Sequence, residues 1–293
     1  MPIILVNKMT SPVFLLVLIS AFSHAAWNFA ARRAAGNLVA IWLGLWLGCT
    51  LVSPGVIGII VYKGVPATIP VQAIICICAT GLIHAVYFRL LAAGYEHGEI
   101  SLVYPIARGS GIGLTAILAS FFLKENFTLP GLIGIALICA GIISLSAAAE
   151  RTASDAKAIA LALSIGATIV AYSLVDKVGV HYINPVVYIW SMFLIAAVFL
   201  TPFVVKRYRG TLRQIAGQYL GYAVVIGIGS IATYLMILFA FTMGRVGYIV
   251  AVRELAVVLG ALAGIIFLKE RFTIPKAIAI CTIVIGVVCI KLS

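Results

Sequence analysis

The chain has 293 residues, of which 64% are hydrophobic and only 10% are charged, and it carries a net charge of +12 at pH 7. A soluble protein is about one quarter charged, so this composition excludes a water-soluble fold and a disordered chain, and it favours a lipid bilayer as the solvent. The positive charge is spread over short gaps rather than gathered on one face, which excludes a nucleic-acid-binding module.

Apolar segments of about 20 residues, the length that crosses a bilayer, recur along the whole chain. We expect ten membrane-spanning helices, at about residues 11–31, 38–62, 70–94, 99–123, 128–148, 156–176, 184–205, 217–241, 246–268 and 273–291. The gaps between them are too short for an extramembrane domain. The sequence therefore predicts an all-α, multi-pass protein of the cell (plasma or inner) membrane.

The six cysteines lie inside apolar stretches, where they resemble small core residues. Cys76 and Cys78 form a C-x-C pair, but no second Cys/His pair completes the spacing of a metal site. We therefore expect no metal and no other cofactor.

The chain repeats itself at an offset of 145 residues. This shift aligns the segment 122–125 (FLKE) with 267–270 (FLKE), and it places Arg108 on Arg253. Such self-similarity indicates a duplication, with a first repeat over 1–148, a linker over 149–155 and a second repeat over 156–293. Because each repeat holds an odd number of spans, the second must cross the membrane in the opposite sense, as inverted repeats of many transporters do.

The residues also resemble a known family, the EamA-type members of the drug/metabolite transporter superfamily. The resemblance covers essentially the whole chain. It lies in the two sets of five spans, in the hydrophobic-Lys-Glu turns at 123–125 and 268–270, each followed by a proline, in Tyr104-Pro105, and in the region of Trp27-Asn28. The resemblance implies a ten-helix bundle around a central cavity, with the fifth and tenth helices peripheral. It leaves the substrate undetermined.

Arg108 and Arg253 are the strongest candidates for a binding site. Each lies well inside a predicted span, where an arginine costs about 2.5–3.5 kcal/mol on insertion scales. Two such residues at equivalent repeat positions predict a pair of cations that face one cavity and bind an anionic group of the substrate. The alternative is structural, with each arginine satisfying helix carbonyls or pairing with an acid.

The embedded acid Glu254 has several interpretations. A regular helix separates adjacent side chains by about 100°, so Glu254 should not simply neutralise Arg253. It could pair with Arg108 or Arg89 across the bundle, or it could carry a coupling proton. His24 is a second proton-coupling candidate, because histidine titrates near neutral pH.

Several spans carry polar or aromatic side chains in one stripe at helical spacing. Beside the two arginines, the residues predicted to line a substrate site are His24, Trp27, Asn28, His84, Tyr87, Tyr104, Tyr172 and Tyr234. For each histidine or aromatic residue alone, core packing is an equally acceptable interpretation. Pro105 falls inside the fourth span, where it removes a backbone donor and could serve as a hinge.

Together these features predict a secondary active transporter that moves a small anionic organic metabolite by alternating access. The alternatives are a membrane-embedded enzyme, a passive channel and a flippase for a lipid-linked substrate; we expect no enzymatic activity, because no catalytic motif is present. The expected partners are the solute, the lipid bilayer and a second copy joined through the fifth and tenth helices. The positive-inside rule places the termini outside, whereas the resemblance implies cytoplasmic termini, so the orientation stays open.

Overall fold

The computed structural model describes residues 9–34, 37–63, 69–97, 100–147, 156–268 and 272–293, and within these ranges the chain is helical apart from short turns. The helices in chain order are α1 (Ser11–Arg33), α2 (Leu38–Lys63), α3 (Val71–His97), α4 (Ile100–Phe122), α5 (Leu129–Ala147), α6 (Ala156–Gly179), α7 (Pro185–Arg207), α8 (Leu212–Met243), α9 (Val246–Arg253), α10 (Leu255–Leu268) and α11 (Ile274–Leu292). The predicted linker at 149–155 lies outside the described residues.

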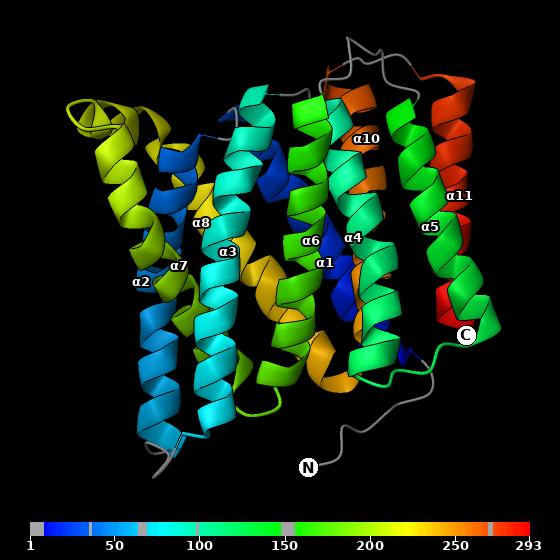
Figure 1. Ribbon diagram of the computed structural model, residues 1–293, viewed down its shortest axis with the longest axis horizontal. Coiled ribbons are helices and arrows are strands. Elements are labelled where there is room, and N and C mark those ends of the chain that lie inside the picture. Colours follow the sequence, from blue (N-terminus) through cyan, green and yellow to red (C-terminus); the bar gives the residue numbers. More distant parts are fainter. Residues whose placement is uncertain (1–8, 35–36, 64–68, 98–99, 148–155, 269–271) are drawn as a thin grey trace.

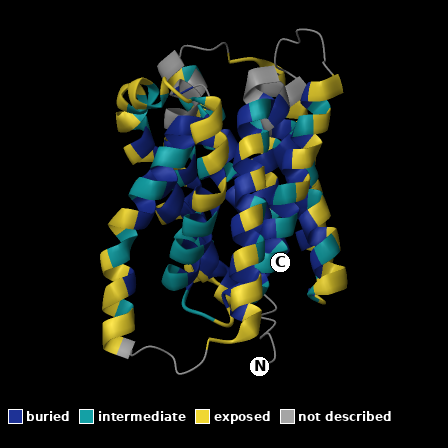
Figure 2. Ribbon diagram, turned by 60° about the vertical axis from the view of Figure 1, so that its left-hand side comes forward, coloured by how far each residue is buried: buried dark blue, intermediate teal, exposed yellow. Residues whose placement is uncertain are grey.

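The predicted multi-pass helical fold is confirmed. Within the described ranges, nine helical segments are long and apolar enough to cross a membrane, and α5 adds a shorter apolar segment, Leu129–Leu145. Large apolar side chains such as Phe22, Ile57 and Phe121 are more than half exposed. Exposed residues follow the outer faces of the helices, while buried ones line the interior (Figure 2). This distribution suits a bundle whose outer surface faces lipid.

The helices of one repeat pack against those of the other (Figure 1). α3 of the first repeat packs on α6 and α7 of the second repeat. Its equivalent in the second repeat, α8, packs in the same way on α1 and α2 of the first repeat. The α2–α7 and α5–α11 contacts each join equivalent helices. Near the end of α11, Lys291 Nζ donates to the carbonyl oxygen of Met9 at 3.1 Å. The chain therefore ends on the side where α1 begins, which we call the terminal side.

The α5–α11 pair shows the internal symmetry at the level of single residues. A Cβ on Gly134 would lie 2.6 Å from the carbonyl oxygen of Gly286, and a Cβ on Gly141 would lie 2.9 Å from that of Ala279. With the 145-residue offset, Gly134 is equivalent to Ala279 and Gly141 is equivalent to Gly286. The two contacts are therefore related by the internal symmetry. Small residues allow this close backbone approach, and the pair forms one edge of the molecule (Figure 1).

The ninth span is broken, although the sequence predicts one helix over 246–268. α9 ends at Arg253 and α10 begins at Leu255, with Glu254 between them at φ −70° and ψ −1°. The backbone N–H of Glu254 donates to the carbonyl oxygen of Ala251 at 3.1 Å, which tightens the turn. In contrast, α4 continues without interruption through Pro105, so a hinge at Pro105 stays a prediction.

The hydrophobic-Lys-Glu turn of the first repeat lies on the terminal side and contacts the start of α9. Lys124 adopts a positive φ of 52°, and the backbone N–H of Glu125 donates back to the carbonyl oxygen of Ala119 at 3.2 Å, as in a helix-ending turn. The buried carboxylate of Glu125 then accepts hydrogen bonds from the backbone N–H groups of Val246 at 2.8 Å and Gly247 at 3.3 Å, at the start of α9. Glu270, the equivalent residue of the second repeat, lies outside the described residues.

Burial raises the pKa of the Glu125 carboxyl, while the two amide donors counteract the rise by stabilising its charged form.

Two further sets of hydrogen bonds between helices lie on the terminal side. Lys177 Nζ donates to the carbonyl oxygens of Phe241 and Gly244, both at 2.6 Å. The buried carboxylate of Asp176 accepts hydrogen bonds from Tyr188 Oη at 2.8 Å and from Tyr234 Oη.

Replacing Glu125 with alanine should destabilise the protein, because the first amides of α9 would lose a buried acceptor. Loss of such a helix cap costs about 1–2 kcal/mol. We expect a lower midpoint of thermal unfolding for Glu125→Ala in detergent. The neighbouring Asn126 is exposed, so Asn126→Ala is the matched control and should unfold like the wild type. Equal midpoints for Glu125→Ala and Asn126→Ala would contradict a stabilising cap.

Candidate functional site: a buried cluster of two arginines and a glutamate

Arg108 and Arg253 meet at one carboxylate near the middle of the bundle. Arg108 Nη1 lies 2.9 Å from Glu254 Oε1, and Arg253 Nη2 lies 3.7 Å from the same oxygen. The three residues are 4%, 2% and 1% exposed, in the order Arg108, Arg253, Glu254. The sequence allowed either Arg108 or Arg89 as the partner of Glu254 across the bundle. In the structure this partner is Arg108.

His24 of α1 completes this cluster, which we call the arginine–glutamate site. Its Nε2 contacts Arg108 Nη2. A guanidinium nitrogen can only donate a hydrogen bond, so this contact requires His24 Nε2 to act as an unprotonated acceptor. With His24 neutral, two guanidiniums and one carboxylate leave the site with an excess of one positive charge.

The arginine–glutamate site contains buried polar atoms that have no hydrogen-bond partner among the residues that the structure describes. They are Nε and Nη2 of Arg253 and Oε2 of Glu254. Buried polar groups are nearly always satisfied in folded proteins, and a buried group without a partner costs about 1–3 kcal/mol. Donors and an acceptor are therefore present for a polar ligand or for water.

Three helices from both repeats bring the charged groups together. Arg108 comes from α4 of the first repeat, while Arg253 and Glu254 lie at the break between α9 and α10 of the second. α4 packs on α9, and α1 packs on α9 and α10. Because Arg108 and Arg253 are equivalent in the duplicated sequence, the internal symmetry brings the two guanidiniums to the same place.

An aromatic cluster adjoins the charged groups. The His84 ring stacks on Tyr172 at 4.4 Å between ring centroids, and it meets Tyr234 edge-on at 5.5 Å and Tyr87 at 6.3 Å. His84 Nδ1 lies 2.9 Å from the carbonyl oxygen of Thr80, to which it donates. α6 and α8, which carry Tyr172 and Tyr234, both pack on α9, which ends at Arg253, so the aromatic cluster lies on helices that contact the charged region.

The remaining predicted site residues have different positions. Trp27 is buried, and its ring meets that of His24 edge-on at 5.1 Å between centroids. Asn28 donates through Nδ2 to the carbonyl oxygen of His24 on its own helix at 2.8 Å, so the structure does not bring it into the cluster. The side chain of Tyr104 lies outside the described residues. Arg89, which the sequence offered as a partner for Glu254, lies instead within α3, eight residues before its end at His97, over the ring of Phe203.

The sequence analysis did not count Asp176 among the embedded acids. Asp176 shares a polar stripe with Tyr172 on the sixth predicted span, but this predicted span ends at residue 176. α6 instead continues to Gly179, and Asp176 is 0% exposed. The available signal was an acid four residues after Tyr172, on the same face of the helix.

Comparison with known proteins agrees with this architecture. The multidrug transporter EmrE of Escherichia coli (strain K12) is 34% identical over 82 residues, which make up 28% of this chain and 68% of that protein. The uncharacterized protein y4nH of Sinorhizobium fredii (strain NBRC 101917 / NGR234) is 30% identical over 100 residues, or 34% of this chain and 68% of that protein. Both relatives are therefore much shorter than this chain.

One solved crystal structure superposes with a TM-score of 0.73 at 16% sequence identity, covering 98% of this chain and 99% of that chain, which shows a shared fold. The family model described as the EamA-like transporter family matches residues 11–147 and, a second time, residues 156–292. This double match agrees with the duplication that the sequence and the helix packing reveal. The chain therefore belongs to the EamA-like transporter family and is a multi-pass membrane transporter built from two EamA repeats.

Proposed function

We propose that the chain is a secondary transporter that moves a small organic metabolite by alternating access, and that an anionic group of this metabolite binds at the arginine–glutamate site. The observation that carries this proposal is the meeting of two guanidiniums from opposite repeats at one carboxylate, where buried donors of Arg253 have no hydrogen-bond partner within the described part of the chain. Sites between inverted repeats can be approached from either side of the membrane.

Glu254 acts in this proposal as an internal counter-ion. While no solute is bound, its carboxylate balances part of the charge of Arg108 and Arg253. An entering anion competes with Glu254 for the same guanidinium donors. If Glu254 takes up a proton at that moment, the two arginines are released for the anion, and one proton then accompanies one negative charge of the solute.

His24 suits the role of proton carrier less well. A proton on Nε2 of His24 would face the guanidinium of Arg108, which already contacts that nitrogen, and two cations in contact repel each other strongly in a buried site. We therefore assign proton coupling to Glu254 and leave His24 the role of orienting Arg108.

The contacts on the terminal side support alternating access. Glu125, which follows α4, binds the first amides of α9 in the other repeat, while Lys177 and Asp176 near the end of α6 bind α8 and α7 within the second repeat. We interpret this arrangement as a closed terminal side, which would have to open in the opposite state of the cycle.

The relative EmrE is a multidrug transporter, and by analogy we expect this chain to accept small organic molecules. Dimerisation through α5 and α11 stays a prediction.

Replacing either arginine with alanine should abolish transport of the anionic solute. A panel of small carboxylates and phosphate esters would first be screened for thermal stabilisation of the purified protein, and the best ligand then used in proteoliposomes. We expect uptake by Arg108→Ala and Arg253→Ala to fall by about tenfold or more per folded molecule, because a charge-assisted contact in a buried site is lost. The exposed Arg209 provides the control, Arg209→Ala. Wild-type uptake by both site variants would refute the anion site.

Glu254→Gln should separate proton coupling from solute exchange. The amide cannot take up a proton, so a pH gradient should no longer drive accumulation of the solute. Counterflow, in which external and internal solute exchange without net proton movement, should persist. His24→Asn should retain accumulation driven by the gradient. The assignment of the proton to Glu254 fails if Glu254→Gln still accumulates solute in response to the gradient.

A further inference from the structure

The face of α1 that carries His24 lies against α8. Ser20, His24 and Trp27 are spaced by four and three residues, so their side chains share one face of the helix. Ser20 Oγ donates a hydrogen bond to the carbonyl oxygen of Thr233 at 3.0 Å. One turn before Thr233, a Cβ on Gly229 would lie 2.5 Å from the Cβ of Trp27, so the tryptophan lies directly against the backbone of α8. His24 is therefore placed along α1 between two points of contact with α8.

Two buried polar atoms of this α1–α8 interface have no hydrogen-bond partner within the described ranges. They are the indole Nε1 of Trp27 and the hydroxyl Oγ1 of Thr233, and the two residues are 7% and 2% exposed. Buried polar side-chain atoms are nearly always paired in folded proteins. The indole N–H can only donate, whereas the hydroxyl can donate and accept. The interface therefore offers hydrogen bonds of both kinds to a molecule that reaches it.

These atoms adjoin the arginine–glutamate site through His24. The rings of Trp27 and His24 meet edge-on at 5.1 Å between centroids, and His24 Nε2 contacts Arg108 Nη2. Arg253, at the same site, also has buried N–H donors that lack a partner among the described side chains and backbone. A solute whose anionic group binds the guanidiniums is therefore close enough for its carbon skeleton to lie along the α1–α8 interface.

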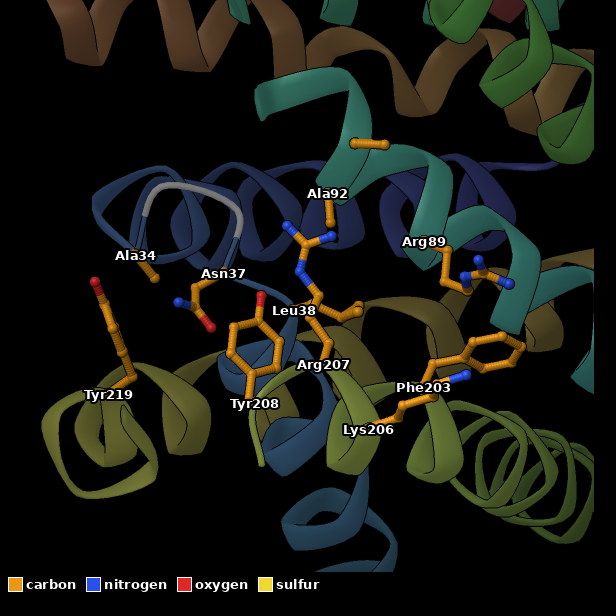
Figure 3. Close-up of a pocket in the computed structure, with 11 residues that line it drawn as sticks. Ala34, Asn37, Leu38, Arg89, Ala92, Phe203, Lys206, Arg207, Tyr208 and Tyr219 are labelled. Carbon is orange, nitrogen blue, oxygen red and sulfur yellow. The ribbon is translucent and has the colours of Figure 1, made fainter. Parts of the chain in front are cut away.

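A cavity on the side opposite the termini connects to the same tryptophan. It has a volume of about 570 Å³ and lies between the end of α1, the start of α2 and parts of α3, α7 and α8. Ala34 and Tyr219, which line it (Figure 3), pack in one apolar cluster with Trp27. Small-molecule sites have volumes of about 300–1,000 Å³. The cavity can therefore admit a small organic acid to the region of Trp27.

We propose that the solute is a hydroxylated organic acid, whose carboxylate binds the two guanidiniums and whose hydroxyl groups bind Trp27 and Thr233. This inference rests on the proposed function, because it specifies the solute of the same site. A hydroxyl group accepts from the indole N–H, and it can donate to Thr233 Oγ1 or accept from it. An acid with a hydrocarbon chain would leave both atoms unpaired. A site with buried polar groups discriminates strongly against a ligand that lacks the matching hydroxyl.

The test measures the affinity of the purified full-length protein for matched acids with and without hydroxyl groups. Isothermal titration calorimetry compares threonate (2,3,4-trihydroxybutanoate) with butanoate, and gluconate with hexanoate. Trp27→Phe keeps an aromatic ring and removes the indole N–H, and Thr233→Val keeps the shape of the side chain and removes the hydroxyl. Trp46→Phe is the matched control. Trp46 Nε1 is also buried and unpaired within the described residues, but it belongs to α2, which packs mainly on α7 and α8.

We expect the wild type to bind the hydroxylated acid of at least one pair about tenfold more tightly than its partner. Trp27→Phe and Thr233→Val should each weaken binding of the hydroxylated acid by about fivefold, because one hydrogen bond is lost, and leave the affinity for the other acid unchanged. Trp46→Phe should bind both acids like the wild type.

Equal affinities within both pairs would overturn the inference, since water would then suffice for the two polar atoms. The inference also fails if none of the four acids binds, if the two variants weaken both acids of a pair alike, or if Trp46→Phe has the same effect as Trp27→Phe. Arg253→Ala separates this failure from that of the proposed function. Binding that survives Arg253→Ala would contradict the anion site itself, whereas equal affinities that are lost in Arg253→Ala would leave the anion site standing.

Discussion

The carboxylate of Glu254 joins the two repeats at the point where burial of charge is most costly. An arginine at the centre of a span costs about 2.5–3.5 kcal/mol on insertion scales, and here two of them lie within 4 Å of one glutamate oxygen. Removing one partner of a buried ion pair costs about 3–5 kcal/mol, because the other charge stays uncompensated. The break between α9 and α10 lets the adjacent Arg253 and Glu254 approach each other, which a regular helix disfavours.

The two ends of the bundle differ in the groups that surround the helix ends. On the terminal side, Glu125 caps α9, and Lys177 binds the carbonyl groups that end α8. The Glu125 contact joins the first repeat to the second, whereas Lys177 and the end of α8 both belong to the second repeat. On the other side, a cavity between the helix ends has Arg89, Lys206 and Arg207 in its lining (Figure 3). Within the proposed mechanism, this asymmetry describes one of the two states that inverted repeats can exchange.

Much of this arrangement could be predicted from the sequence. Apolar segments gave the helical fold, and the repeated FLKE segment gave the duplication, because both depend on local pattern. Arg108 and Arg253 could be assigned to one site for two reasons. A charge inside an apolar span is costly, and the 145-residue offset makes the two arginines equivalent. The partner of Glu254 stayed open, since helix rotation is set by tertiary packing. Asp176 was not counted among the embedded acids because the predicted sixth span ended there, and the break at Glu254 leaves no mark in the hydropathy.

The account depends on the claim that Glu254 competes with the solute for the guanidiniums of Arg108 and Arg253. The affinity of the purified Glu254→Gln variant for the anion that best stabilises the wild type tests this claim directly. A competing carboxylate lowers the affinity for an anion, so the account predicts that Glu254→Gln binds this anion more tightly than the wild type, by about tenfold. Weaker or unchanged binding would contradict the account, because Glu254 would then hold the solute itself or play no part in the site.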